Sequence, residues 1–196
     1  MLEGDHDYKF VKFIVNNKYR DEDISTYNFR NSNKNNTEIH FISNFIQDNQ
    51  YNTKKLAIKI ENGKYNLQKL MTKSIQLIVP VIEQLQLIYL TDLDSKDPFD
   101  LINKMNDDFK ARGNTYEFKW EKYLINCDHI YACKIQSVNN HKNISNDNII
   151  FIFFKKSLED ELPTFKDKIP DYGEVSKFID NKEHLHIKKI LNDEYI

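Results

Sequence analysis

Two short stretches of this chain are apolar at nearly every position, and they constrain the fold more than any other feature. One stretch runs over residues 86–90 and the other over residues 149–154. A strand that is apolar on both faces has to be covered on both faces, which is typical of parallel sheets that carry helices on each side. We therefore expect an α/β fold with a mostly parallel sheet flanked by helices.

The rest of the first half alternates between helical and strand spacing. The apolar pattern predicts helices over residues 5–18, 39–46 and 66–79, and strands over residues 24–29 and 56–60. Residues 31–36 read as a polar loop. Asp97 followed by Pro98 is a helix-start signal, and that helix is expected to end before Gly113.

The second half begins with strand-like alternation and ends with helical patterns. The predicted elements are paired strands over 116–120 and 130–135, a polar loop over 139–148, a short helix capped by Ser157, and amphipathic helices over 174–192. We therefore expect an α/β domain over residues 1–163 with an added β-hairpin. A C-terminal helical extension over residues 164–196 is expected to pack on it.

Composition narrows the classes of function. The chain has 196 residues, a size typical of one domain, with a formal net charge of −2. Such a balance argues against a strongly basic nucleic-acid clamp, but it leaves room for an enzyme whose metal ions offset repulsion from phosphate. Cys127 and Cys133 are too few for a zinc quartet. His129 lies between them, so a Cys/His/Cys cluster is one interpretation, and alternating strand residues are the favoured one.

Segments for membrane insertion or export are not apparent in the sequence. No apolar run approaches the ~20 residues that a membrane span requires, and no signal peptide is visible. We therefore expect a cytoplasmic protein without a membrane partner.

Two acidic motifs lie at positions where a metal-binding or catalytic site is expected. The segment Glu3–Asp7 opens the first predicted helix, and Asp92 and Asp94 directly follow an apolar strand. The carboxyl ends of parallel strands converge on one crevice, so Glu3 and these two aspartates would meet there if their strands are neighbours. The two-residue period of a strand predicts that Asp92 and Asp94 project on the same face. Carboxylate oxygens are the ligands that Mg²⁺ prefers.

In this order, the motifs resemble the Toprim domain of topoisomerases, primases, some ribonucleases and the overcoming-lysogenization-defect nucleases. Two softer similarities are Ser157-Leu158-Glu159 after an apolar strand and the segment 61–67 between a strand and a helix. The family has a full strand before its glutamate, whereas only Met1 and Leu2 precede Glu3. A missing central strand would leave hydrogen-bonding edges of the sheet unpaired.

The resemblance implies a catalytic metal site. It implies Glu3, Asp92 and Asp94 as catalytic groups and Mg²⁺, for which Mn²⁺ can substitute, as the cofactor. The metal ligands it implies are Glu3, Asp7, Asp92, Asp94 and Glu159, with Glu161 as an alternative to Glu159. Lys64 and Lys96 are candidates for phosphate contact, since one precedes a predicted helix and the other follows the second motif.

The function that follows is a Mg²⁺-dependent nuclease, or a related phosphoryl-transfer enzyme, that acts on RNA or DNA. One alternative is a non-catalytic Toprim-like module that binds nucleic acid or a protein. In that module Tyr116, Phe118 and Trp120 would either stack on bases or lie in the core. Another is a haloacid-dehalogenase-like phosphatase with Asp92 as its nucleophile.

The sequence assigns no role to the histidines. His6 is adjacent to the first acidic motif, but most surface histidines have no chemical function. His184 and His186 are expected to face solvent on a late helix.

Overall fold

The computed structural model describes residues 1–28, 38–50, 56–61, 63, 86–94, 96–139, 144–167, 169–182 and 184–192. The elements, in chain order, are α1 (Asp5–Val15), η1 (Asp21–Asp23), β1 (Ile24–Asn28), α2 (Glu38–Gln50), β2 (Leu56–Ile60), β3 (Leu87–Asp92), α4 (Pro98–Ala111), β4 (Tyr116–Asn126), β5 (Ile130–Asn139), β6 (Ile144–Phe154), α5 (Leu158–Glu161), η4 (Pro163–Lys166), α6 (Tyr172–Asp180) and α7 (Leu185–Leu191). The expected α/β class is confirmed.

The strands form a parallel part and a mixed part. Strands β1 and β2 are parallel neighbours, and the other four follow the order β3-β6-β5-β4. Strand β3 runs parallel to β6, whereas β5 is antiparallel to both β6 and β4. The predicted β-hairpin is therefore present as β4 and β5, at one edge of the sheet.

The first residues of the chain join the two parts. Leu2 forms parallel bridges to Ile60 of β2 and to Leu90 of β3. Its N–H donates to the Lys59 carbonyl at 2.8 Å, and the Leu90 N–H donates to the Met1 carbonyl at 3.0 Å. The short segment at residues 1–3 thus fills the central position of the sheet. The hydrogen-bonding edges of β2 and β3 are therefore paired at this position, because these few residues have partners on both sides.

This arrangement creates a reversal of winding at the centre of the sheet. The chain leaves residues 1–3 through α1 toward β1, whereas it leaves β3 through α4 toward β4 at the opposite edge. Neighbouring strands whose connections lead in opposite directions leave a crevice between their carboxyl ends. The crevice lies where residue 3 and the end of β3 meet.

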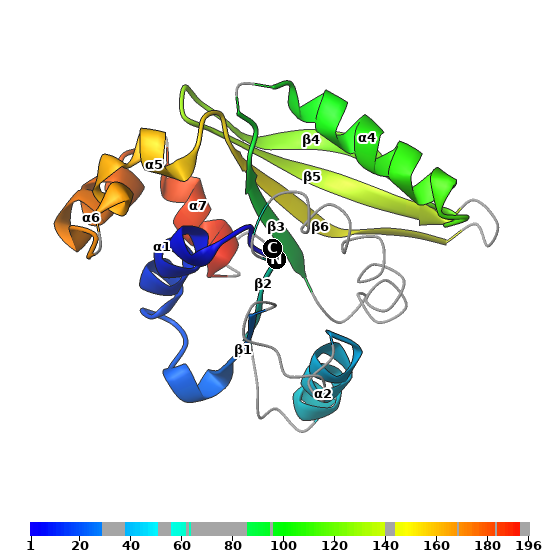
Figure 1. Cartoon of the computed structure of the whole chain (residues 1–196), viewed down its shortest axis with the longest axis horizontal. Coiled ribbons are helices and arrows are strands. Elements are labelled where there is room, and N and C mark those ends of the chain that lie inside the picture. Colours follow the sequence, from blue (N-terminus) through cyan, green and yellow to red (C-terminus); the bar gives the residue numbers. More distant parts are fainter. Residues whose placement is uncertain are drawn as a thin grey trace.

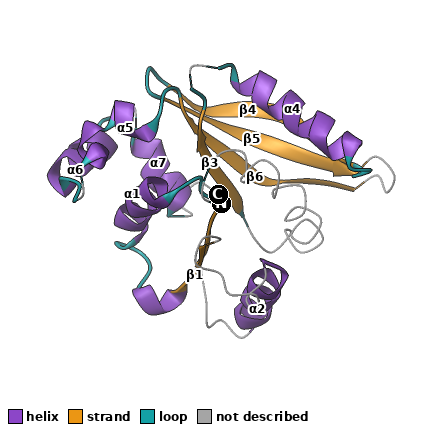
Figure 2. Cartoon of the chain, viewed as in Figure 1, coloured by secondary structure: helices purple, strands orange, loops and turns teal. Residues whose placement is uncertain are grey.

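Helices cover both faces of the sheet (Figures 1 and 2). On one face, Leu90 and Ile152 share a buried cluster with residues of α1, α5, α6 and α7. On the other face, Tyr89 and Phe151 share a second cluster with residues of α4. Burial on both faces explains why β3 and β6 are apolar at consecutive positions.

The two C-terminal helices belong to the first cluster, through Val175, Ile179, Ile187 and Ile190. The expectation that His184 faces solvent is wrong, because its side chain is buried. Its Nδ1 lies 2.7 Å from the carbonyl oxygen of Phe178, and the two rings are in contact. His184 is the N-cap residue of α7 and therefore lies in the corner between the two helices.

Several boundaries differ from the sequence-based expectation. The loop predicted over 139–148 is instead largely strand, since β5 continues to Asn139 and β6 begins at Ile144. Antiparallel pairing extends past the apolar core, so polar residues continue these strands. Helix α1 ends at Val15 rather than at residue 18. The predictions for 31–36 and 66–79 lie outside the described residues.

Among the described residues, no helix combines the length and the apolarity that crossing a membrane would demand.

Candidate functional site

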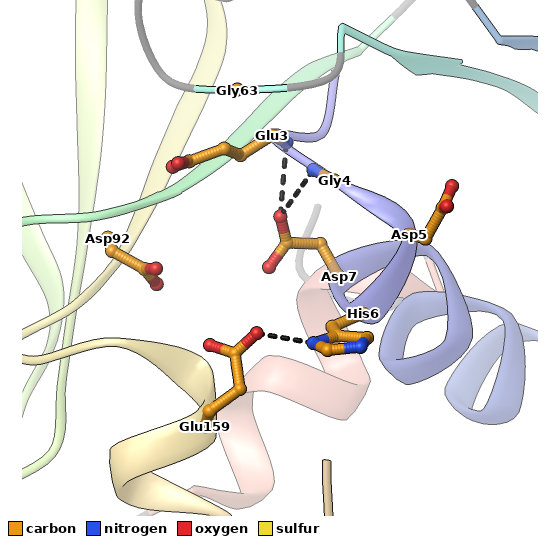
Figure 3. Close-up of a pocket in the computed structure, with 8 residues that line it drawn as sticks. All are labelled: Glu3, Gly4, Asp5, His6, Asp7, Gly63, Asp92 and Glu159. Carbon is orange, nitrogen blue, oxygen red and sulfur yellow. Dashed lines mark hydrogen bonds and ion pairs between the residues drawn. The ribbon is translucent and has the colours of Figure 1, made fainter. Parts of the chain in front are cut away.

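An open pocket of about 220 Å³ lies at the central crevice of the sheet (Figure 3). Its lining comes from residues 1–3 and α1, from the turn after β2, from the end of β3, and from α5. The lining residues are Glu3, Gly4, Asp5, His6, Asp7, Gly63, Asp92 and Glu159. Five of these eight residues are acidic, and they include Glu3 and Asp7 of the first predicted motif, Asp92 of the second, and the predicted Glu159 after β6.

Glu3 is positioned by its two neighbours in the sheet. The Thr91 hydroxyl of β3 donates to Glu3 Oε2 at 2.8 Å, and Gly63 donates its N–H to the Glu3 carbonyl at 2.8 Å. Gly63 has a φ of 115°, which glycine adopts without steric cost. The pKa of the underlying Tyr89 is raised by burial and further by the charges of Glu3 and Glu61.

Asp92 ends β3 and points into the same pocket (Figure 3). Its Oδ1 accepts a hydrogen bond from the Leu158 N–H at 3.2 Å, at the start of α5. This contact connects the end of β3 to the segment after β6. The structure therefore brings Glu3 and Asp92 together, as the convergence of parallel strand ends predicted.

Asp7 is buried beneath the pocket and completes the first turn of α1. Its Oδ2 accepts hydrogen bonds from the Gly4 N–H at 2.9 Å and the Glu3 N–H at 3.1 Å. Burial raises the pKa of Asp7 to about 7, the charges of Glu3 and Glu159 raise it as well, and the two backbone hydrogen bonds oppose the shift. Asp7 therefore titrates near neutral pH.

His6 is the pocket residue to which sequence reasoning assigned no role. Its Nδ1 contacts Glu159 Oε1, which lies 153 positions later in the chain, and both side chains are partly exposed. The signal that could have indicated His6 is its position in the first turn of α1, between Asp5 and Asp7 of the first acidic motif. Its partner became apparent only when α5 was placed beside α1.

Asp94 does not follow the expected geometry. Strand β3 ends at Asp92, and Asp94 has a φ of 50° in the turn that follows. The expectation that both aspartates project on one strand face is therefore wrong. Asp94 is exposed and does not line the pocket, whereas Leu93 between them is buried against the α4 side.

The remaining predicted side chains lie around the pocket or outside the described residues. Lys96 is exposed in the connection from β3 to α4, and Lys64 falls in an undescribed segment. Asp5 lines the pocket, but its carboxylate points away from it and accepts a hydrogen bond from Asn28 Nδ2 at 3.3 Å.

The donor set suits a hard cation with a partly retained water shell. Over the described residues, no group of three or more His, Cys, Asp or Glu side chains is arranged to hold one metal ion. Mg²⁺ commonly uses only one or two protein carboxylates, and waters and substrate phosphates complete its octahedron. Glu3 and Asp92 offer two carboxylates at the pocket, with Glu159 on its third side.

Comparisons with family models, with curated proteins and with solved structures found no significant match to this chain.

Proposed function

We propose that this chain is a Mg²⁺-dependent nuclease on a Toprim-like fold, with its reaction centre between Glu3 and Asp92. The observation that supports the proposal most is that Glu3 and Asp92, which come from motifs distant in sequence, line one pocket at the central crevice. In open α/β sheets, ligands bind at that position.

Each proposed ligand is held by a neighbour that limits its motion. Thr91 orients the Glu3 carboxylate, and the Leu158 N–H orients Asp92. Glu3 and Asp92 would hold Mg²⁺, which would supply Lewis acidity and lower the pKa of a coordinated water. Asp7 contributes by holding the backbone of residues 3 and 4, so that the Glu3 side chain is directed into the pocket.

The His6–Glu159 pair provides the proton chemistry in this proposal. Nδ1 of His6 contacts Glu159, both side chains line the pocket, and Nε2 points away from Asp92 (Figure 3), so a proton would pass to a substrate through Nδ1 and Glu159. Histidine titrates near neutral pH and is a common general acid or base, and a carboxylate at Nδ1 fixes its tautomer and orientation. We expect His6 to protonate the leaving oxygen by way of Glu159.

The proposal is tested first by the effect of metal on stability. A ligand that binds only the folded state at a hundred times its dissociation constant stabilises it by about 2.7 kcal/mol. We expect millimolar Mg²⁺ to raise the melting temperature of the wild type but not that of Asp92→Asn. Asp107→Asn changes an exposed acid of α4 and should keep the full shift.

Cleavage of labelled RNA and DNA provides the second measurement. We expect cleavage that requires Mg²⁺ or Mn²⁺ and falls on the order of a hundredfold in Asp92→Asn. The proposal would be disproved if Mg²⁺ raised the melting temperature equally in Asp92→Asn and Asp107→Asn and no substrate were cleaved in a metal-dependent way.

A further inference from the structure

Four aromatic side chains form a continuous row on the α4 face of the sheet. Phe99 comes from the first turn of α4, Trp120 and Tyr123 from β4, and Tyr131 from β5. The ring centroids are 4.2 Å apart between Phe99 and Trp120, 4.7 Å between Trp120 and Tyr123, and 5.8 Å between Tyr123 and Tyr131. Phe99 and Tyr123 are 42% and 41% exposed, so this aromatic row presents ring surface to solvent.

A β-bulge in β4 creates the row. The pairing register shifts between Trp120 and Lys122, so Trp120 lies opposite Ile135 and Tyr123 lies opposite Cys133. Ile135 and Cys133 point to the same face, and Trp120 and Tyr123 therefore do as well. In a regular strand, residues three apart would point to opposite faces. Bulges often re-aim a side chain next to a functional site.

The row begins at the same level of the sheet as the acidic pocket. Tyr131 lies opposite Phe153 of β6, and Phe153 lies opposite Thr91, the residue that holds Glu3. Two strand spacings separate Tyr131 from Thr91, which corresponds to about 10 Å. Lys155, just after β6, places its Nζ 4.2 Å from the centre of the Tyr131 ring. A cation thus lies at the end of the row that is nearest the pocket.

The exposed rings can stack on unpaired bases, and the cation in line with them can contact a phosphate of the same strand. Bases stack on aromatic side chains only when they are unstacked from a partner strand, as in single-stranded nucleic acid. The pKa of Tyr123 is raised by burial, then by Tyr131 and by the nearby carboxylate of Asp97. With this carboxylate beside the row and a net charge of −2, stacking rather than phosphate neutralisation has to supply most of the affinity. In a duplex the bases are already stacked on one another, so a duplex would contact this surface mainly through its phosphates.

We infer that the aromatic row binds single-stranded nucleic acid and directs it past Lys155 toward the Glu3–Asp92 pocket. The inference rests on the proposed function, since it names the substrate class of that site as single-stranded RNA or DNA. Two or more bases would stack along Phe99, Trp120 and Tyr123.

Trp120 is the only tryptophan in the sequence, so intrinsic fluorescence reports directly on the row. We would titrate the protein with oligothymidylate or oligouridylate in EDTA, so that binding is measured without cleavage. Saturable quenching is expected, with affinity about tenfold weaker in Tyr123→Ala and in Phe99→Ala. Tyr123→Phe keeps the ring and should bind like the wild type.

Tyr172→Ala is the matched control. Tyr172 is 40% exposed on α6 and, like the row residues, stacks on a neighbouring ring, that of Phe13. Its loss should leave the affinity unchanged, and a duplex of the same sequence should compete poorly. Absence of quenching, or equal losses in Tyr172→Ala and Tyr123→Ala, would overturn the inference.

The two proposals fail in different ways. Binding of single strands without metal-dependent cleavage would contradict the proposed function alone. Metal-dependent cleavage of duplexes with unchanged Trp120 fluorescence would contradict the aromatic row alone.

Discussion

Two histidine–glutamate pairs share the short helix α5 but lie in different surroundings. Glu159 contacts Nδ1 of His6, and Glu161 contacts Nδ1 of His129. The histidine side chains are similarly exposed, at 41% and 44%, whereas the glutamates differ, at 31% for Glu159 and 6% for Glu161. The same pair of groups therefore occurs once at an open pocket and once at the margin of the core.

The neighbours decide what each pair can do. His6 and Glu159 line the pocket together with Glu3 and Asp92. His129 instead lies against the rings of Phe178 and His184, at centroid distances of 6.0 Å and 5.3 Å. A proton can reach a substrate from the first pair. The second pair instead joins the turn between β4 and β5 to the corner between α6 and α7. Residue type alone would not have separated these roles.

The largest expected effect is on catalysis. General acid–base groups contribute about 10²–10⁴-fold to rate, so His6→Gln should lower the cleavage rate by at least a hundredfold. Glutamine retains a polar side chain of similar size but does not transfer a proton. His129→Gln should leave the rate unchanged.

The rates should be measured as a function of pH, because loss of a proton donor removes one limb of the pH–rate profile. Equal losses in both variants, or an unchanged profile in His6→Gln, would refute the distinction between the two pairs.

The next effect is on the free energy of unfolding, and here the buried histidine rather than the pocket histidine should show the larger loss. His184→Ala removes a buried ring and its hydrogen bond to the Phe178 carbonyl, which we expect to cost about 2–3 kcal/mol. His6→Ala removes a partly exposed ring and should cost less than about 0.5 kcal/mol. Urea denaturation measures both values. Comparable losses would mean that the pocket histidine also supports the core.

A further effect on stability depends on pH, and it concerns Asp7 at the pocket. The pKa of Asp7 is about 7 in the folded protein, above the usual value of about 3.9 in an unfolded chain. Between about pH 4 and 7 the folded state holds a proton that the unfolded state has released. Stability therefore falls as pH rises through this window, by up to about 1.4 kcal/mol per pH unit.

Asp7→Asn provides the measurement. Its amide oxygen can still accept the N–H groups of Glu3 and Gly4, but it does not titrate. In metal-free buffer, the wild type should lose stability relative to Asp7→Asn between pH 5 and pH 8. A constant difference across this range would show that Asp7 is already charged in the folded protein.

Local signals in the sequence determined the ends of several elements. Asp97 caps α4, with its Oδ1 accepting the Phe99 N–H at 2.7 Å, as the Asp-Pro signal predicted. Gly113 ends that helix with a φ of 68°, and Ser157 caps α5 through the Asp160 N–H. These features depend on contacts within four residues, so the residue types are sufficient to predict them.

The sequence by itself also determined the α/β class, since the apolar runs at β3 and β6 require cover on both faces. Only the tertiary structure decided that Leu2 pairs with two strands at once, that a bulge turns Tyr123 to the face of Trp120, and that Glu159 meets His6. Each of these depends on strand register or helix placement between distant segments. Such placement follows from the packing of the whole sheet, which no local pattern of residues encodes.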